Sequence, residues 1–222
     1  MEWLKKIVKV PLYFLGNLVY LISHLVPKDA HLWVFGAWFG EKYADNSKYL
    51  FEYVNEKHGE IRAVWLTKDR ATVKHIRQKG YNASLSYGLK GHLLSMRAKV
   101  AVVSQSELRD INGLALSSKT QLVQLWHGTP LKKIMFDDRV ALGKSSVLRK
   151  LILLILPVFK KHFDFSNTLL IATSDKVRQN ISSAFRVSES NVRVTGYPRT
   201  DAFFRARQDI PLSEALTVLR NK

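Results

Sequence analysis

Residues 169–194, LLIATSDKVRQNISSAFRVSESNVRV, place a strand, a helix and a second strand in direct succession. The apolar run 169–172 predicts a buried strand, and the apolar spacing of 175–185 predicts a helix with Ser174 as its N-cap. A second β-rich run follows at 192–194. Strands that alternate with helices in this way are typical of parallel pairing, so this unit predicts an α/β fold.

The same alternation extends back along the chain to His31. We expect further strands at 32–35, 63–66, 100–103 and 122–125, and helices at 48–56, 71–79 and 89–97. Near-continuous apolar strands with helices between them indicate a parallel sheet covered on both faces. Residues 29–222 are therefore predicted to form a single Rossmann-like parallel-sheet domain. Its ligands should gather at the carboxyl ends of the strands.

The composition restricts the class of protein. Of 222 residues, 46% are hydrophobic and 11% aromatic, which excludes a disordered polyelectrolyte. The formal net charge of +17 favours a polyanionic partner, namely nucleic acid, an anionic membrane surface or an acidic polymer, over a merely solvated basic surface. The absence of cysteine excludes disulfides, thiolate zinc sites and a cysteine nucleophile. No His, Asp or Glu cluster has metal-ligand spacing, so no metal is expected.

Residues 1–28 form a segment of their own, in which Lys5, Lys6 and Lys9 precede the apolar run 10–26. This run is barely long enough to cross a hydrocarbon core of about 30 Å. The segment could be an interfacial anchor, a spanning helix or a buried core helix. Because Trp3, Tyr13 and Tyr20 are rings of the kind that lie at headgroup level, we favour a membrane-associated helix that lies in the interface.

A second apolar stretch covers residues 148–163. Basic residues bracket its centre, and no acidic residue occurs from 139 to 163. Such a segment could bind an anionic leaflet or could equally be a core helix with solvated ends. The basic residues concerned are Arg149, Lys150, Lys160 and Lys161.

The segment 124–133, QLWHGTPLKK, carries the strongest candidate site. His127 follows a predicted strand, Gly128 permits an unusual backbone angle, and Thr129 with Pro130 would open a helix. Free amides at that helix start would bind an anion, with help from one of Lys132 and Lys133. A neutral imidazole there could take a proton from an attacking hydroxyl, although a structural histidine is the alternative.

Two further strand ends carry polar residues. Ser174 is predicted to cap a helix and could also contact a phosphate at the same edge. Arg199 stands in the turn 196–201, GYPRTD, where its planar guanidinium could bind phosphate oxygens or pair with a nearby carboxylate. Dinucleotide-binding, P-loop and nucleophile-elbow motifs do not occur, and neither does a nucleic-acid-binding motif.

The stretches 126–133, WHGTPLKK, and 196–201, GYPRTD, resemble the CDP-glycerol:poly(glycerophosphate) glycerophosphotransferase family of teichoic acid biosynthesis. Residues 45–51, DNSKYLF, also resemble a segment of this family, while Thr200 replaces its more usual asparagine. The resemblance extends from about Trp33 to Phe204.

The resemblance implies a GT-B architecture, in which the first of two Rossmann-like domains handles the membrane-bound acceptor. The second would hold the donor substrate CDP-glycerol, and no cofactor is implied. His127 matches the proposed general base, which deprotonates the acceptor hydroxyl for attack on the donor's β-phosphorus with CMP leaving. The implied partners are the anionic inner leaflet and a poly(glycerol phosphate)-type lipid-linked acceptor. We therefore expect a peripheral protein at the cytoplasmic face of the cell membrane.

The resemblance stops short of the family's donor side. A second histidine and the nucleotide-contacting segments of that side have no counterpart in this sequence. We therefore expect an acceptor-side half that lacks the C-terminal donor-binding domain and has negligible activity alone. It would either complete an enzyme with a separate donor domain or serve as a non-catalytic module that binds membrane or polyanion.

Overall fold

The computed structural model of the chain describes residues 9–138 and 164–204. The predicted segment 148–163, with its four basic residues, lies outside the described residues, as do Lys5 and Lys6.

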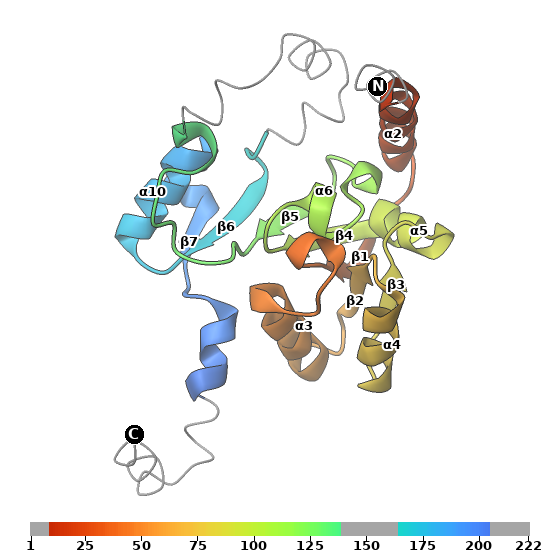
Figure 1. The fold of residues 1–222 in the computed structure, drawn as a ribbon, viewed down its shortest axis with the longest axis horizontal. Coiled ribbons are helices and arrows are strands. Elements are labelled where there is room, and N and C mark those ends of the chain that lie inside the picture. Colours follow the sequence, from red (N-terminus) through yellow and green to blue (C-terminus); the bar gives the residue numbers. More distant parts are fainter. Residues whose placement is uncertain (1–8, 139–163, 205–222) are drawn as a thin grey trace, which may run out of the picture.

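The core of the protein is a seven-stranded sheet in the order β3-β2-β1-β4-β5-β6-β7 (Figure 1). Every neighbouring pair is parallel. The single α/β domain with a parallel sheet is thereby confirmed. The strands are β1 Asp29–Phe35, β2 Arg62–Thr67, β3 Ala83–Leu85, β4 Ala98–Val103, β5 Gln121–Gln124, β6 Thr168–Ala172 and β7 Val192–Val194.

Helices and short 3-10 turns connect these strands. The α-helices are α2 Lys9–Ser23, α3 Asp45–Lys57, α4 Arg70–Gln78, α5 Leu89–Arg97, α6 Glu107–Asp110 and α10 Asp175–Phe185. The 3-10 turns are η1 Trp38–Gly40, η2 Gly113–Ala115, η3 Met135–Asp137, η4 Glu189–Asn191 and η5 Pro198–Thr200. All the predicted strands and connecting helices are present at nearly the expected positions, and the short β3 and α6 were not predicted.

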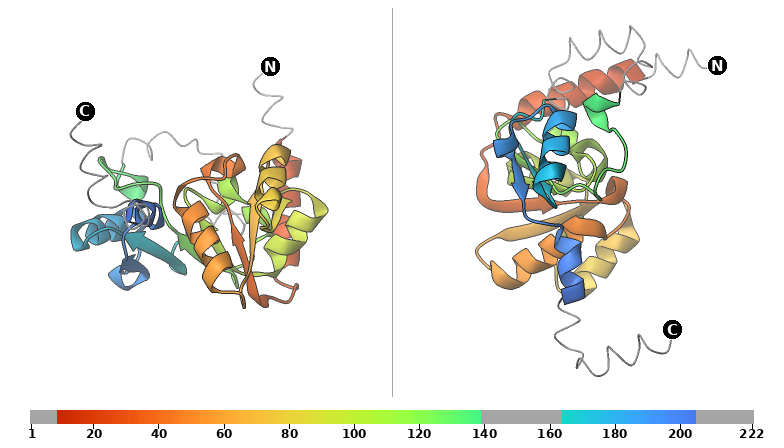
Figure 2. Two further views of the ribbon diagram at one scale, coloured as in Figure 1. Left: turned by 90° about the horizontal axis from the view of Figure 1, so that it is seen from below. Right: turned by 90° about the vertical axis from the view of Figure 1, so that its left-hand side faces the viewer.

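Alternate residues of the central strands pack into two hydrophobic cores, one on each face of the sheet. Phe35 and Trp65 pack with Phe51 of α3 and Ile76 of α4 on one face. Residues one position earlier or later in the same strands pack on the other face with Leu94 of α5 and Ile111. This period of two is what a strand imposes when both of its faces are buried. The two faces are visible in Figure 2, with α3 and α4 on one side of the sheet.

Helix α2 has one docked face and one exposed apolar face. It approaches η2 so closely that a Cβ on Gly16 would lie 3.3 Å from Leu114 Cδ1. Just after the helix, His24 Nε2 hydrogen-bonds Ser118 Oγ at 3.0 Å. The side chains on the other face are 43–60% exposed, namely Phe14, Leu15, Leu18, Leu21 and Ile22. No helix within residues 9–138 or 164–204 has the length and apolarity that a membrane span requires.

Candidate functional site at the carboxyl edge of the sheet

The candidate residues lie where β4, β5 and β6 end. Ser104 follows β4, His127 comes shortly after β5, and Thr173 follows β6. Because the strands are parallel, all of these ends meet at one edge of the sheet. The sequence-based prediction that ligands gather at this edge therefore has a structural counterpart in a cluster of polar groups.

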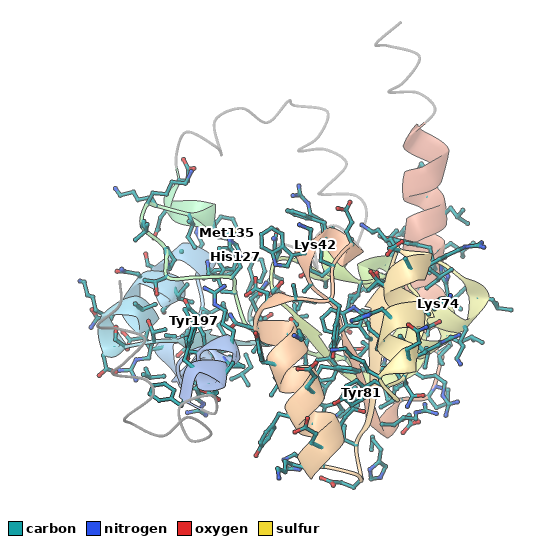
Figure 3. All side chains as sticks on the ribbon, turned by 60° about the horizontal axis from the view of Figure 1, so that its bottom comes forward. Lys42, Lys74, Tyr81, His127, Met135 and Tyr197 are labelled. Carbon is teal, nitrogen blue, oxygen red and sulfur yellow. The ribbon has the colours of Figure 1, made fainter. Side chains whose placement is uncertain are left out.

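His127 is exposed, and its ring is held from one side. Nδ1 lies 3.3 Å from the carbonyl oxygen of Ser104. The imidazole packs against the Trp126 indole, with ring centroids 4.5 Å apart and planes inclined by 31°. A carbonyl oxygen only accepts hydrogen bonds, so a hydrogen bond at this contact places a proton on Nδ1, and in the neutral imidazole Nε2 then carries the lone pair that can accept a proton. Figure 3 shows His127 well apart from Lys74 and Tyr81.

Trp126, the residue before this histidine, has a left-handed backbone with φ of 54°. Its N–H donates to Gln124 Oε1 at 3.1 Å, and Gln124 Nε2 donates to the Gln105 carbonyl oxygen at 2.9 Å. The indole meets Phe185 of α10 edge to face at 5.3 Å. A left-handed bulky residue is strained and persists only where its surroundings hold it, so these contacts maintain the turn that presents His127.

The loop after β4 is organised by a buried carboxylate. Asp110 accepts hydrogen bonds from the backbone N–H groups of Ser104, Gln105 and Ser106, and from that of Phe39. Burial raises the pKa of Asp110, although these four amides favour its charged form. The carboxylate thereby fixes the segment whose Ser104 carbonyl faces His127.

Arg199 forms an ion pair, one of the two outcomes that the sequence left open. Its Nη1 lies 3.0 Å from Asp45 Oδ1. The Asp45 side chain is only 1% exposed, whereas that of Arg199 is 37% exposed. A Cβ on Gly128 would lie 3.7 Å from Arg199 Nη2, so the guanidinium spans the gap between α3 and the His127 turn. The ion pair therefore leaves Arg199 partly open to a ligand.

The predicted helix start at Thr129 and Pro130 is wrong. Residues 127–134 form an irregular loop that leads into η3. Ile134, Met135 and Phe136 are consecutive, yet all three pack against the cluster around α10. An α-helix places only every third or fourth residue on one face, so it could not bring three adjacent side chains there. The expected cradle of helix amides is therefore absent from this described loop.

The other predicted site residues divide into two groups. Thr129 Oγ1 lies 3.4 Å from Thr173 Oγ1, which joins the His127 loop to the end of β6. Ser174 caps α10 as predicted, because its hydroxyl accepts from the Val177 N–H at 3.3 Å. Lys132 and Lys133 are exposed, and neither makes an ion pair within the described part of the chain.

Four residues that shape this edge were not among the predicted site residues: Asp45, Asn46, Ser104 and Asp110. Two of them belong to the stretch 45–51 whose sequence had already stood out. The polar run that directly follows β4 is a second signal, because polar residues after a buried strand point to the carboxyl edge. The ion pair itself gives no sequence signal, since its partners are 154 positions apart.

The described residues contain no candidate metal site near this edge, and the cavity found beside α3 is separate from His127. Within residues 9–138 and 164–204, no three His, Asp or Glu side chains form a group that could hold a metal ion. A cavity of about 350 Å³ lies between α3 and residues 198–202, lined among others by Tyr49, Tyr53 and Pro198. His127 does not line this cavity.

Known proteins resemble this chain in sequence and in fold. It is 31% identical over 195 residues to the teichoic acid glycerol-phosphate transferase of Staphylococcus aureus (strain NCTC 8325 / PS 47), covering 85% of the chain and 46% of that protein. It is 24% identical over 186 residues to the teichoic acid poly(glycerol phosphate) polymerase of Bacillus subtilis (strain 168), covering 82% and 23%. The solved wall teichoic acid polymerase TagF superposes with a TM-score of 0.66 at 21% identity, covering 93% of this chain and 48% of that one.

The chain thus spans about half the length of the Staphylococcus aureus relative and of the solved polymerase. The family described as CDP-Glycerol:Poly(glycerophosphate) glycerophosphotransferase matches residues 18–222, which include every described element except the first half of α2. The chain therefore belongs to the CDP-glycerol:poly(glycerophosphate) glycerophosphotransferase family.

Proposed function

We propose that this chain is the acceptor-side half of a teichoic acid glycerophosphotransferase, which transfers glycerol phosphate from CDP-glycerol to a membrane-linked acceptor. The observation that carries the proposal is the position and hydrogen bonding of His127. In a chain that matches the CDP-Glycerol:Poly(glycerophosphate) glycerophosphotransferase family, His127 Nδ1 lies 3.3 Å from the Ser104 carbonyl oxygen at the carboxyl edge, and its Nε2 makes no hydrogen bond to any described residue. Arg199 lies beside the same turn and can compensate phosphate charge.

The proposed chemistry is an in-line displacement. His127 Nε2 takes the proton of the acceptor's terminal hydroxyl as that oxygen forms a bond to the β-phosphorus of CDP-glycerol. The bond from this phosphorus to the CMP oxygen breaks, and CMP leaves. Transfer of this kind depends on positioning and on charge stabilisation. The GT-B arrangement and a donor-binding domain supplied in addition to residues 29–222 belong to the same proposal.

Membrane association is also part of the proposal. The exposed apolar face of α2 would lie in the interface at the cytoplasmic face of the membrane, and the net charge of +17 would favour anionic lipids. A poly(glycerol phosphate)-type acceptor would meet the same basic surface. Arg149, Lys150, Lys160 and Lys161 are proposed to contribute to it.

The test is complementation. The full chain is mixed with the separately produced C-terminal half of the Staphylococcus aureus relative, liposome-bound acceptor and CDP-glycerol, and CMP release is measured. We expect release that requires both chains and falls by about 100-fold or more in His127→Ala. Equal release with wild type and His127→Ala would contradict the assigned base. Acceptor binding without any release under any pairing would favour the alternative, a non-catalytic module that holds polyanion or membrane.

A further inference from the structure

The turn that opens α3 is linked to the turn that presents His127. Asp45, the first residue of α3, has a left-handed backbone with φ of 64°, and Trp126 is also left-handed. Outside glycine, such conformations are uncommon and persist where surrounding contacts impose them. Asp45 and Trp126 both lie at the carboxyl edge, and the side chain that follows Asp45 in sequence bonds to the backbone of Trp126.

That side chain is Asn46, which is fully buried. Its Nδ2 donates to the Trp126 carbonyl oxygen at 2.9 Å and lies 3.4 Å from that of Leu125. Its Oδ1 accepts from the Arg199 backbone N–H at 3.3 Å. A single amide thus connects the start of α3, the end of β5 and the turn after β7.

The contact with Trp126 bears directly on the histidine. The Trp126 carbonyl belongs to the peptide that carries the His127 nitrogen, so fixing that oxygen fixes the plane from which His127 departs. Gln124 holds the N–H of Trp126 from the other side. With the residue held at both of its polar groups, the His127 ring comes within hydrogen-bonding distance of the Ser104 carbonyl.

The neighbouring Asp45 acts on Arg199. The carboxylate binds the guanidinium through Oδ1, while Asn46 binds the backbone of the same arginine. Asp45 Oδ2 is buried and has no hydrogen-bond partner among the described residues. The Asp45 carboxylate therefore orients the Arg199 guanidinium, whose Nη2 lies beside Gly128.

We propose that Asn46 is a positioning residue for the transferase reaction, and that Asp45 supports it. Asn46 holds the Trp126 peptide so that His127 keeps its proton on Nδ1 and presents Nε2 as the proton acceptor. Asp45 and Asn46 together align Arg199 beside that ring. Both side chains are buried, so each acts through the residues it holds. The catalytic meaning of this arrangement rests on the proposed function, but the arrangement itself can be tested without turnover.

A buried asparagine could simply stabilise the fold, so the test needs a measurement that does not depend on the stability of the protein. The tautomer of His127 is such a measurement, because nitrogen NMR of the imidazole distinguishes a proton on Nδ1 from one on Nε2. The full chain is measured as wild type, Asn46→Ala and Asn46→Asp. The aspartate keeps an acceptor for the Arg199 N–H but cannot donate to the Trp126 carbonyl.

Asn191→Ala is the matched control. Asn191 also donates through Nδ2 to two backbone carbonyls, those of Ser166 at 2.7 Å and Thr168 at 3.4 Å. These lie before and at the start of β6, at the opposite edge of the sheet from His127. Its loss should lower the melting temperature and leave the His127 tautomer unchanged.

We expect the Nδ1–H tautomer in wild type and in Asn191→Ala, and loss of that preference in both Asn46 variants. A wild-type His127 protonated on Nε2 would overturn the proposal even if every Asn46 variant failed to fold. An unchanged tautomer in a folded Asn46→Ala would overturn it as well. If the tautomer follows Asn46 but the complementation assay shows no dependence on His127, the positioning stands and the proposed function falls.

Discussion

At the scale of single residues, the carboxyl edge depends on backbone conformations that few side chains tolerate. Gly128 has φ of 156°, next to the left-handed Trp126 and the His127 turn. Among the described residues, an added Cβ there would meet only Arg199 Nη2 at 3.7 Å, which is an ordinary contact. The need for glycine at this position therefore comes from the backbone and not from crowding.

Gly128→Ala should lower the free energy of unfolding by on the order of 1–3 kcal/mol, because alanine must adopt this disfavoured angle. Urea unfolding of the full chain measures the change. Gly59→Ala is the control, since a Cβ at Gly59 would meet no described residue within 4 Å, and its effect should stay within about 0.5 kcal/mol. Equal effects of the two substitutions would mean that the angle at Gly128 carries no strain.

The ion pair between Asp45 and Arg199 should be measurable by a double-mutant cycle. Removing one partner of a fully buried pair costs about 3–5 kcal/mol. Arg199 is 37% exposed, so we expect a coupling of only about 1–2 kcal/mol between Asp45→Asn and Arg199→Gln. Asparagine suits the left-handed angle at position 45, which limits other effects.

The pair of Arg62 and Asp29 is the comparison for this cycle. Its side chains are 49% and 22% exposed, so its coupling should be about 0.2–1 kcal/mol. A coupling at Asp45 no larger than this would show that the buried carboxylate is not held by the arginine.

At the scale of elements, the N-terminus of α4 links stability to pH. The Asp69 carboxylate accepts hydrogen bonds from the Thr72 hydroxyl and from the N–H groups of Thr72 and Ala71. These bonds hold the pKa of Asp69 below its usual value. The stability they confer is therefore present above the ordinary aspartate pKa of about 3.9 and is lost as the pH falls through the lower folded value.

Wild type should be more stable than Asp69→Asn at neutral pH, and the difference should shrink as the pH falls below about 4. Unfolding curves at a series of pH values give this difference. Glu41→Gln serves as the control, because Glu41 accepts a hydrogen bond only through its backbone oxygen within the described part of the chain. A difference between wild type and Asp69→Asn that stays constant with pH would rule out the linkage.

The proposed contact of the exposed α2 face with a membrane can be tested by liposome binding. Phe14 is 60% exposed on this face, and Phe203 is 75% exposed on the segment after η5. That segment belongs to the blue helix that lies far from α2 in Figure 1. If α2 lies in an anionic interface, Phe14→Gln should weaken binding to anionic liposomes, measured by co-sedimentation, by about tenfold or more, since burying such a ring contributes about 1.5–3 kcal/mol. Phe203→Gln should bind as wild type does. Equal loss in both variants would contradict a specific role for α2.

At the scale of the whole molecule, the charge of +17 predicts binding that depends strongly on salt. Affinity of the full chain for poly(glycerol phosphate) should fall by on the order of tenfold or more between about 50 and 200 mM salt, because phosphate contacts release counterions. Titration of a labelled polymer measures this, with a neutral polymer as the control. An affinity that does not change with salt would show that the basic charge does not drive acceptor binding.

The sequence predicted the sheet better than it predicted the site. Buried strands such as β4 and β6 are apolar runs, which hydrophobic periodicity detects, whereas β3 has only three residues and offers no period. The helix predicted at Thr129 is wrong because that prediction used only neighbouring residues. The conformation of this loop depends instead on the packing of residues 134–136 against α10, which is distant in sequence. The bonds from Asn46 to the ends of β5 and β7 depend on which strands become neighbours, and that is decided by the fold.

The strand order also has a consequence for how the protein is made. The four strands β3, β2, β1 and β4 are complete once residue 103 has been synthesised, and β5, β6 and β7 then follow in sequence order at a single edge. After β4 has joined, no later strand must insert between two earlier ones. A nascent chain leaving the ribosome can therefore grow its sheet outward one strand at a time, and each emerging hydrophobic strand finds its docking edge already formed.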